Sequence, residues 1–160
     1  MPRVDEIDIR ERLGWRPDGD SYDKVRELWI AHSKAEDARD LDGLIATLTD
    51  DCVYELCGLD IRWEGHEGAR RFYTELISAF PDIHFDLIDI VIGPQGVYEF
   101  AAVQGTFKSK WIGIEPDGRE HRWRNGIFFA WDPEAERFAG EKVIGEPGAP
   151  GWQLFGSARL

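Results

Sequence analysis

The sequence predicts a single α+β domain in which three helices close the concave side of a curved antiparallel sheet. Apolar residues recur with helical spacing in the first half of the chain, and from residue 83 onwards they alternate with a period of two. The 160 residues are 42% hydrophobic and 31% charged, an ordinary composition for one globular domain. Helices that precede a run of strands, instead of alternating with them, favour the α+β class.

Three helices are expected in the first half of the chain. The first starts at Tyr22 after a cap by Ser21, and its buried face follows the i, i+3, i+4, i+7 spacing of an amphipathic helix. This face consists of Tyr22, Val25, Leu28, Trp29, His32 and Ala35. A shorter helix runs from Asp40 to Leu48, and a third runs from His66 to Ala79 and is stopped by Pro81.

The remaining regular segments are expected to be extended. They are Cys52–Cys57, a short piece around Arg62–Trp63, and four longer strands, Ile83–Ile92, Val97–Phe107, Glu120–Trp131 and Arg137–Ile144. The first long strand exposes His84 and Asp86 and then buries Ile88 and Ile90 on the same parity, which predicts a bend or bulge. The third alternates cleanly, and one face carries His121, Trp123, Asn125, Ile127, Phe129 and Trp131.

Two end segments fall outside the predicted domain, which covers residues 21–146. Residues 1–20 form a charged arm that either packs on a partner subunit or stays loose, and residues 147–160 form a Gly- and Pro-rich tail with a short apolar patch. The net charge of −12 repels nucleic acid and anionic membranes, so neither is an expected partner. With no apolar leader and no run near the roughly 20 residues of a membrane span, the cytoplasm is the expected location.

Several chemical classes are not expected. The odd spacing of Cys52 and Cys57 on an extended segment points them to opposite faces, which argues against a disulfide. The four histidines come from different elements and form no HxH or HExxH pattern, so no metal site is predicted. The chain has no Gly-rich phosphate loop, and we expect no cofactor.

A bent sheet closed by helices leaves a hollow, and the aromatic residues are numerous enough to line it. The chain has seven Trp, nine Phe and four Tyr. Large rings fill cores and also line pockets, so plain core packing is the alternative for each. The expected substrate-binding side chains are Trp29, Trp63, Tyr73, Trp123, Phe129 and His121. Trp63 and Tyr73 are expected near the open end, and His121, near a strand end, is alternatively solvated.

A family resemblance rests on short segments in a characteristic order. They are Asp40-Leu41-Asp42-Gly43-Leu44 running into Asp50-Asp51-Cys52-Val53-Tyr54, Trp63-Glu64-Gly65-His66-Glu67-Gly68-Ala69, Phe80-Pro81-Asp82, and Gly105-Thr106-Phe107 followed by Trp111-Ile112-Gly113-Ile114-Glu115-Pro116-Asp117-Gly118. In this order and spacing they resemble the SnoaL-like branch of the NTF2-like superfamily, over roughly Tyr22 to Ile144. The resemblance implies a cone-shaped α+β barrel, usually a homodimer through the outer sheet face. Its members include polyketide cyclases, ketosteroid isomerases, dehydratases, epoxide hydrolases and non-catalytic proteins, so the fold alone names no reaction.

The catalytic positions of the family are only partly matched. Against the ketosteroid isomerase pattern, the oxyanion-hole tyrosine position falls on His32 and the catalytic-base position falls on Leu56. Against the polyketide cyclase pattern, the acid/base aspartate falls on Val143 and the cavity histidine on Ile127. The Asp-Arg-Asp set of limonene epoxide hydrolase has no convincing counterpart. The resemblance therefore implies the scaffold without one particular chemistry.

Four residues are the candidates for catalysis. His32 titrates near neutrality when unperturbed and lies on the apolar face of the first helix; the alternative is a core histidine with one hydrogen bond. The resemblance places Glu141 two residues before the cyclase aspartate position, on the same strand face, where burial would raise its pKa; the alternative is a surface ion pair with Lys142 or an arginine. Asn125 is a candidate hydrogen-bond donor in the pocket. Tyr54 is a candidate donor to a developing oxyanion, or else a packed tyrosine.

These observations predict a cofactor-independent acid–base enzyme of the isomerase, cyclase, dehydratase or hydrolase type. Its substrate would be a small hydrophobic cyclic molecule in an internal pocket. A non-catalytic binding or carrier protein for an apolar small molecule is the alternative, and a pure interaction domain is a third hypothesis.

Overall fold

The computed structural model describes residues 3–16 and 18–150, and its elements confirm the α+β class. The predicted apolar patch of the tail lies outside these residues. In chain order the elements are η1 (Val4–Glu6), α1 (Ile9–Arg12), α2 (Gly19–Asp37), α3 (Leu41–Ile45), β1 (Leu48–Leu56), β2 (Ile61–Glu64), α4 (Gly65–Ala79), β3 (His84–Gly93), β4 (Gly96–Thr106), β5 (Glu120–Asp132) and β6 (Arg137–Gly145). The predicted extended piece around Arg62–Trp63 is β2.

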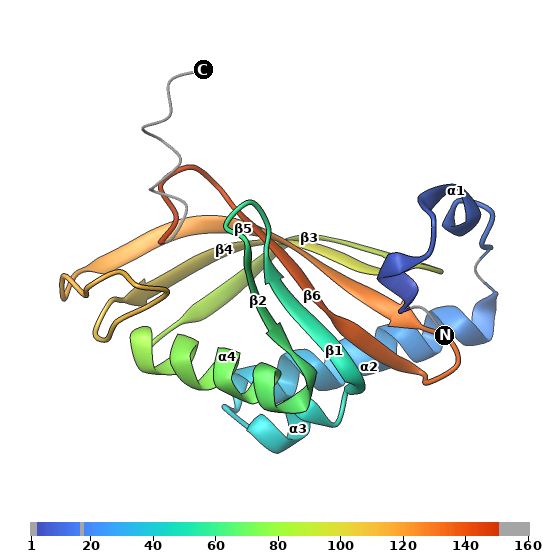
Figure 1. The fold of residues 1–160 in the computed structure, drawn as a ribbon, viewed down its shortest axis with the longest axis horizontal. Helices are drawn as coiled ribbons and strands as arrows, with labels where there is room; N and C mark the ends of the chain where they lie inside the picture. The colour runs from blue at the N-terminus through green and yellow to red at the C-terminus, as the bar shows by residue number, and fades with distance from the viewer. Residues whose placement is uncertain (1–2, 17, 151–160) are drawn as a thin grey trace.

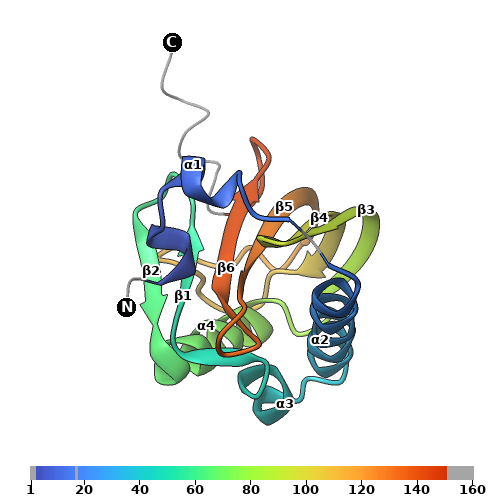
Figure 2. The same cartoon turned by 90° about the vertical axis from the view of Figure 1, so that its right-hand side faces the viewer.

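One six-stranded sheet, in the order β2-β1-β6-β5-β4-β3, forms the body of the domain. Only the β1–β6 pair is parallel among its neighbouring strands, and the other pairs are antiparallel. Figure 1 shows the sheet curving over α2, α3 and α4, which lie together on its concave side. Figure 2 shows the same layers from the end. The sheet is open, and β2 and β3 are its edges.

The first two predicted helices have different limits in the structure. Helix α2 begins at Gly19, because the carboxylate of Asp18 accepts a hydrogen bond from the backbone N–H of Ser21 over 2.8 Å. Asp18 is therefore the N-cap, and the predicted cap at Ser21 is wrong. Helix α3 ends at Ile45, three residues short of Leu48, which already belongs to β1.

Strand β3 confirms one expectation and corrects another. Its pairing with β4 shifts register between Leu87 and Asp89, which confirms the predicted bulge. Ile88 and Ile90 are nevertheless 49% and 37% exposed, so the prediction that they are buried is wrong. As an edge strand, β3 has a neighbour on one side only.

The core lies between the concave face of the sheet and the helices. On β5, alternate residues from Trp123 to Trp131 are buried, and Arg122 and Arg124 on the opposite parity are exposed, as predicted. The N-terminal arm covers part of the outer face: Val4 packs with Ala130 and Ala139 of the same chain. Figure 2 shows this arm and the helices α2–α4 on opposite sides of the sheet.

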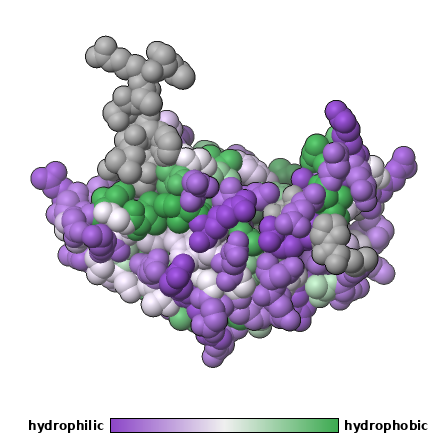
Figure 3. Space-filling model, in the orientation of Figure 1, coloured by the Kyte–Doolittle hydropathy of each residue, from purple (hydrophilic) through white to green (hydrophobic). Residues whose placement is uncertain are grey.

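Charged and polar side chains dominate the face seen in Figure 3, and apolar ones gather along its upper margin, over the sheet. Within the described residues, no helix is both long enough and apolar enough to cross a bilayer. A cytoplasmic location stays a prediction.

Candidate functional site

A buried histidine–glutamate pair lies at the centre of the domain. His32 from α2 is 1% exposed and Glu141 from β6 is 5% exposed. The Nε2 atom of His32 lies 3.1 Å from Oε1 of Glu141. Helical periodicity points His32 inward, and the parity of β6 places Glu141 on the same inner face as Val143.

The hydrogen bonds of this pair fix its proton content. The Thr47 hydroxyl donates to the carbonyl of Leu44 over 2.7 Å, so its oxygen is left to accept from Nδ1–H of His32, also at 2.7 Å. Nε2 of His32 therefore faces Glu141 with either a proton or a lone pair. A lone pair facing a carboxylate would be repulsive, so one proton is shared between Nε2 and Oε1.

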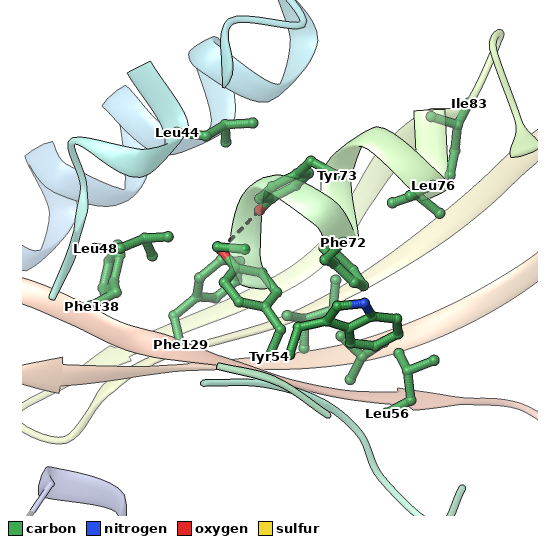
Figure 4. Packing of buried hydrophobic residues seen from close by; sticks show 14 of the residues in the cluster. Leu44, Leu48, Tyr54, Leu56, Phe72, Tyr73, Leu76, Ile83, Phe129 and Phe138 are labelled. Carbon is green, nitrogen blue, oxygen red and sulfur yellow. Dashed lines mark hydrogen bonds between the residues drawn. The ribbon is translucent and has the colours of Figure 1, made fainter. Parts of the chain in front are cut away.

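Two tyrosines extend the pair into a hydrogen-bonded chain. The Tyr73 hydroxyl donates to Oε1 of Glu141 over 2.7 Å and lies 2.9 Å from Nε2 of His32. Because its single proton is used in this way, the Tyr54 hydroxyl, 3.0 Å away, donates to Tyr73. Figure 4 shows the two hydroxyls pointing toward each other beside α4. Burial, with the nearby charge of Glu141, raises the pKa of both phenols well above the ordinary value, which keeps them protonated as donors.

Two narrow cavities flank this network. The first, of about 40 Å³, is lined by Glu141, Glu36 and Asn125 together with apolar side chains that include Phe80, Trp111 and Trp123. The second, of about 60 Å³, is half polar: its lining is His32, Ser33, Glu36, Asp37 and Glu99, together with Trp29, Phe85, Leu87, Ala101 and Phe129. The histidine–glutamate pair therefore has its carboxyl group at one cavity and its imidazole at the other.

Two further carboxyl groups face these cavities. Glu36 stands one helical turn after His32, and burial followed by the charges of Glu141 and Glu99 raises its pKa well above the ordinary value. Glu99 on β4 is 8% exposed and accepts a hydrogen bond from Nε1–H of Trp29 over 3.0 Å. Burial and then the charge of Glu141 raise the pKa of Glu99 to about 7, and the Trp29 bond partly offsets them. A carboxyl group with this pKa can give or take a proton near neutral pH.

Asn125 presents an unsatisfied polar group to the first cavity. Its side chain is 7% exposed, and its Oδ1 atom is buried without a hydrogen-bond partner in the described part of the chain. A buried polar atom without a partner costs roughly 1–3 kcal/mol, and this oxygen is open to accept one hydrogen bond.

The other predicted site residues divide between cavity and core. Trp29 and Phe129 line the second cavity and Trp123 lines the first, as expected for pocket walls. His121 lies away from the network, 2.9 Å from Asp117, beside a small separate cavity. Tyr54 is fully buried behind Tyr73 and contacts that hydroxyl, so its geometry does not bring it to either cavity.

Two predicted positions differ from expectation. Trp63 and Tyr73 are 4% and 1% exposed, and the prediction that they lie near the open end is wrong. Trp63 stacks on Trp111 with ring centroids 6.0 Å apart, and Tyr73 belongs to the polar network. Helix α4 carries Tyr73 next to Phe72 on its inner face, because residues one position apart are only about 100° apart around a helix.

Glu36, Glu99 and Thr47 were missed by the sequence-based prediction. Signals existed for two of them. Glu36 follows His32 by four residues and so shares its helix face. Glu99 is a charged residue on the inward parity that also carries Val97, Ala101 and Val103. Thr47 precedes β1 and gave no such signal. Among the described residues, no group of three or more His, Cys, Asp and Glu side chains has the arrangement of a metal site.

Comparison with known proteins identifies the family. The model of the SnoaL-like domain matches residues 29–139. A candidate SnoaL-like polyketide cyclase from Jannaschia sp. CCS1 superposes with a TM-score of 0.71 at 16% identity, over 82% of this chain and 92% of that one. AclR, a candidate hydroxylase from Streptomyces galilaeus, gives 0.66 at 16% identity, over 87% and 85%.

A third similar structure is SalBIII, an epoxide hydrolase/cyclase-like enzyme with a role in pyran ring formation in the polyether salinomycin. It gives a TM-score of 0.63 at 16% identity, over 78% of this chain and 92% of that one. At these identities the similarity shows the fold alone. A search of curated proteins finds no significant match. Because the family model covers more than half of the sequence, the chain belongs to the SnoaL-like domain family and has its NTF2-like fold.

Proposed function

We propose that this protein is a cofactor-independent acid–base enzyme that isomerises, cyclises, dehydrates or hydrates a small, largely apolar ring compound. The observation that carries the proposal is the buried contact between Nε2 of His32 and Oε1 of Glu141, with a cavity on each side. A general base must lie within reach of the substrate and must have somewhere to pass its proton. Glu141 lies at the first cavity, within reach of a substrate there, and would return the proton that it takes to the substrate or to solvent.

In the proposed mechanism, Glu141 exchanges a proton with the substrate in the first cavity. Because one proton already lies between Nε2 of His32 and Oε1, a proton taken from the substrate would stay on the other carboxyl oxygen of Glu141 and return from there to the substrate or to solvent. The Nδ1–H of His32 stays bound to Thr47 and holds the ring in one orientation. The Tyr73 hydroxyl donates to the same Oε1 atom and stabilises the carboxylate form. Asn125 would donate to an oxygen on which negative charge develops.

The substrate class follows from the walls of the cavities. Aromatic and aliphatic side chains form most of the lining of the first cavity, and they form the half of the second cavity that Trp29, Phe85, Leu87, Ala101 and Phe129 contribute. Such walls favour a ring compound with few polar groups. The family resemblance to cyclases and epoxide hydrolases supports the same class.

Proton transfer can be tested without knowing the natural substrate. The probe is 2-tetralone, an apolar ring ketone, and the readout is exchange of its α-hydrogens in D₂O followed by proton NMR. We expect the protein to accelerate this exchange, and we expect Glu141→Gln and His32→Gln to lose about 10²–10⁴-fold of the acceleration. Glu55→Gln is the matched control, because Glu55 lies on the neighbouring β1 strand and pairs with Arg62 outside the network.

Either of two results would remove this assignment. One is exchange no faster than in buffer while 2-tetralone is shown to bind. The other is full activity in both network variants. Near-ultraviolet circular dichroism of each variant separates a catalytic loss from a loss of folding.

The alternative function is a non-catalytic carrier for an apolar molecule. The observation in its favour is that Glu141 already has two hydrogen-bonding neighbours, Tyr73 and His32. A carrier would bind 2-tetralone without exchanging its hydrogens, so the same experiment separates the two functions.

We also propose that two copies associate through the outer face of the sheet. Val91, Tyr98 and Ile144 are 65%, 43% and 55% exposed on the outward parity of β3, β4 and β6. Contiguous exposed apolar side chains are typical of protein interfaces. Sedimentation of the wild type should give a dimer and Ile144→Asp a monomer; a monomeric wild type would exclude this assembly.

A further inference from the structure

The two cavities are separated by only a thin partition. Two side chains, Glu36 of α2 and Phe85 of β3, contribute to the walls of both cavities. Glu36 is half-buried, and Phe85 is partly exposed at the edge of the sheet. A shift of these two side chains would therefore join the cavities into one.

Each cavity has a hydrogen-bonding group near the point where they approach. Asn125 lines the first cavity and Glu99 lines the second. Ala101 pairs directly with Asn125 across β4 and β5, and Glu99 is two residues from Ala101 on the same face. Diagonal neighbours of this kind have Cα atoms about 7–8 Å apart. The side chains beside this diagonal are Ala101 on β4 and Ile127 on β5, which pairs directly with Glu99.

Both groups have unused hydrogen-bonding capacity. The Oδ1 atom of Asn125 is buried without a partner in the described residues. Glu99 accepts from Trp29 through Oε2, and no described residue is seen to bond to its other oxygen. Both side chains are more than nine-tenths buried, so a ligand group would satisfy them better than bulk water can.

We propose that one ligand occupies both cavities at once, across the position now held by the Phe85 ring, with one polar group bound by Asn125 and a second bound by Glu99. This proposal rests on the proposed function, because it uses the same site and names its substrate class. The class is a flat apolar compound of about two fused rings with a hydroxyl group at each end, because Oδ1 of Asn125 and the second carboxyl oxygen of Glu99 both accept hydrogen bonds. Its central carbons would lie beside Glu36 and Glu141.

Phe85 is well placed to move. It lies on an edge strand that is paired only with β4, two residues before the bulge at Leu87 and Asp89. Its neighbours on the strand, His84 and Asp86, are exposed. Segments with few buried contacts open at low free-energy cost. Because the pKa of Glu99 is about 7, its carboxyl group can either accept or donate a hydrogen bond near neutral pH.

Equilibrium binding of three probes tests the proposal. They are 2,6-dihydroxynaphthalene, which is polar at both ends, 2-naphthol, which is polar at one end, and naphthalene. By calorimetry we expect one dihydroxynaphthalene per chain, bound more tightly than the other two. Asn125→Ala and Glu99→Gln should each weaken this single binding event by about tenfold, the value of one hydrogen bond. For 2-naphthol only one of the two substitutions should matter.

The partition is tested by association rates. Phe85→Ala should speed association of 2,6-dihydroxynaphthalene by about tenfold, because no ring has to move first. Leu87→Ala is the matched control: Leu87 is on the same strand and lines the second cavity but not the first, so its rate should not change.

Four results would overturn the proposal. They are two independent equivalents of dihydroxynaphthalene, sensitivity of its binding to only one of the two polar substitutions, equal rates in the Phe85 and Leu87 variants, or no binding to either the wild type or Phe85→Ala. Because no turnover is measured, these outcomes are separate from the 2-tetralone experiment. If the protein exchanges the tetralone hydrogens but binds two molecules of 2,6-dihydroxynaphthalene, the proposed function is supported and the proposal of one ligand across both cavities is refuted.

Discussion

The two tyrosines of the network provide a sharp test of its direction. Tyr73→Phe and Tyr54→Phe are the same chemical change at two buried positions, 1% and 0% exposed, with hydroxyls 3.0 Å apart. The chain of donors runs from Tyr54 to Tyr73 to Glu141. Removing the middle member should therefore cost more stability than removing the first.

The expected difference follows from the contacts of each hydroxyl. Tyr73→Phe removes a bond to the Glu141 carboxyl group, worth about 1.5–3 kcal/mol when that group is charged, and takes from the Tyr54 hydroxyl its acceptor 3.0 Å away, worth about 1 kcal/mol, for a total of about 3 kcal/mol. Tyr54→Phe removes one neutral bond, worth about 1 kcal/mol, and Tyr73 keeps its bond to Glu141. In a chain of this size, about 2–4 °C of Tm accompanies each kcal/mol.

Urea unfolding at one pH, followed by tryptophan fluorescence, measures both free energies, with thermal unfolding as a second reading. We expect a loss of about 6–12 °C for Tyr73→Phe and about 2–4 °C for Tyr54→Phe. The double variant should lose less stability than the sum of the two single variants. Part of the cost of Tyr73→Phe comes from the Tyr54 hydroxyl losing its acceptor, and that hydroxyl is absent in the double variant. Equal costs, or a larger cost for Tyr54→Phe, would show that the donor order derived above is incorrect.

Three further predictions concern single side chains. Thr47→Val should destabilise the fold by about 1–3 kcal/mol, because the imidazole Nδ1–H loses its acceptor, whereas Thr49→Val should be neutral or stabilising, because the Thr49 hydroxyl is buried without a partner in the described chain; urea unfolding compares them. The pKa of Glu99 is raised in the folded state, so the native protein holds this proton more tightly than the unfolded chain does. The free energy of unfolding should therefore fall as pH rises from about 4.5 through about 7. Urea unfolding at several pH values measures this fall, and Glu99→Gln should flatten its upper part. Gly140 has φ of 115° and an added Cβ would lie 2.0 Å from a carbonyl oxygen of β1, so Gly140→Ala should cost more than about 3 kcal/mol or yield insoluble protein, while Gly19→Ala, with open space around it, should be tolerated; soluble yield and Tm decide.

The sequence predicted most elements because local signals there agreed with the fold. Helical spacing of apolar residues defined α2 and α4, and alternation defined β5. The N-cap was misassigned because Asp18 and Ser21 are both good caps, and the choice depends on where the chain approaches the sheet. The exposure of Ile88 could not be predicted from the sequence either. The sequence pattern predicts burial for an apolar residue on an edge strand whether or not another element covers that strand.

The candidate site was predicted in part for a similar reason. Periodicity orients His32 inward, and strand parity orients Glu141, but their contact joins residues 109 positions apart and depends on the packing of α2 over β6. Tyr73 was expected in the pocket wall, because one residue pattern fits both an aromatic wall and a hydrogen-bond donor. Glu36 and Glu99 were not predicted as site residues, although Glu36 shares a helix face with His32 and Glu99 lies on the inward face of β4. A single charged residue in an apolar stripe is usually expected to be exposed to solvent.

The cost of the carboxyl groups bears on what the site does. Glu36, Glu99 and Glu141 lie close enough for their charges to raise the pKa of Glu36 and Glu99, with one imidazole among them. Replacing buried ionisable groups by apolar ones of similar size is often neutral or stabilising, so a protein that only stored an apolar molecule would gain from leucine or valine at these places. Here the destabilising groups face the cavities and are held by donors from Tyr73 and Trp29, which keep them ordered. Proton transfer needs titratable groups of this kind and storage does not, which supports the proposed acid–base function over the carrier.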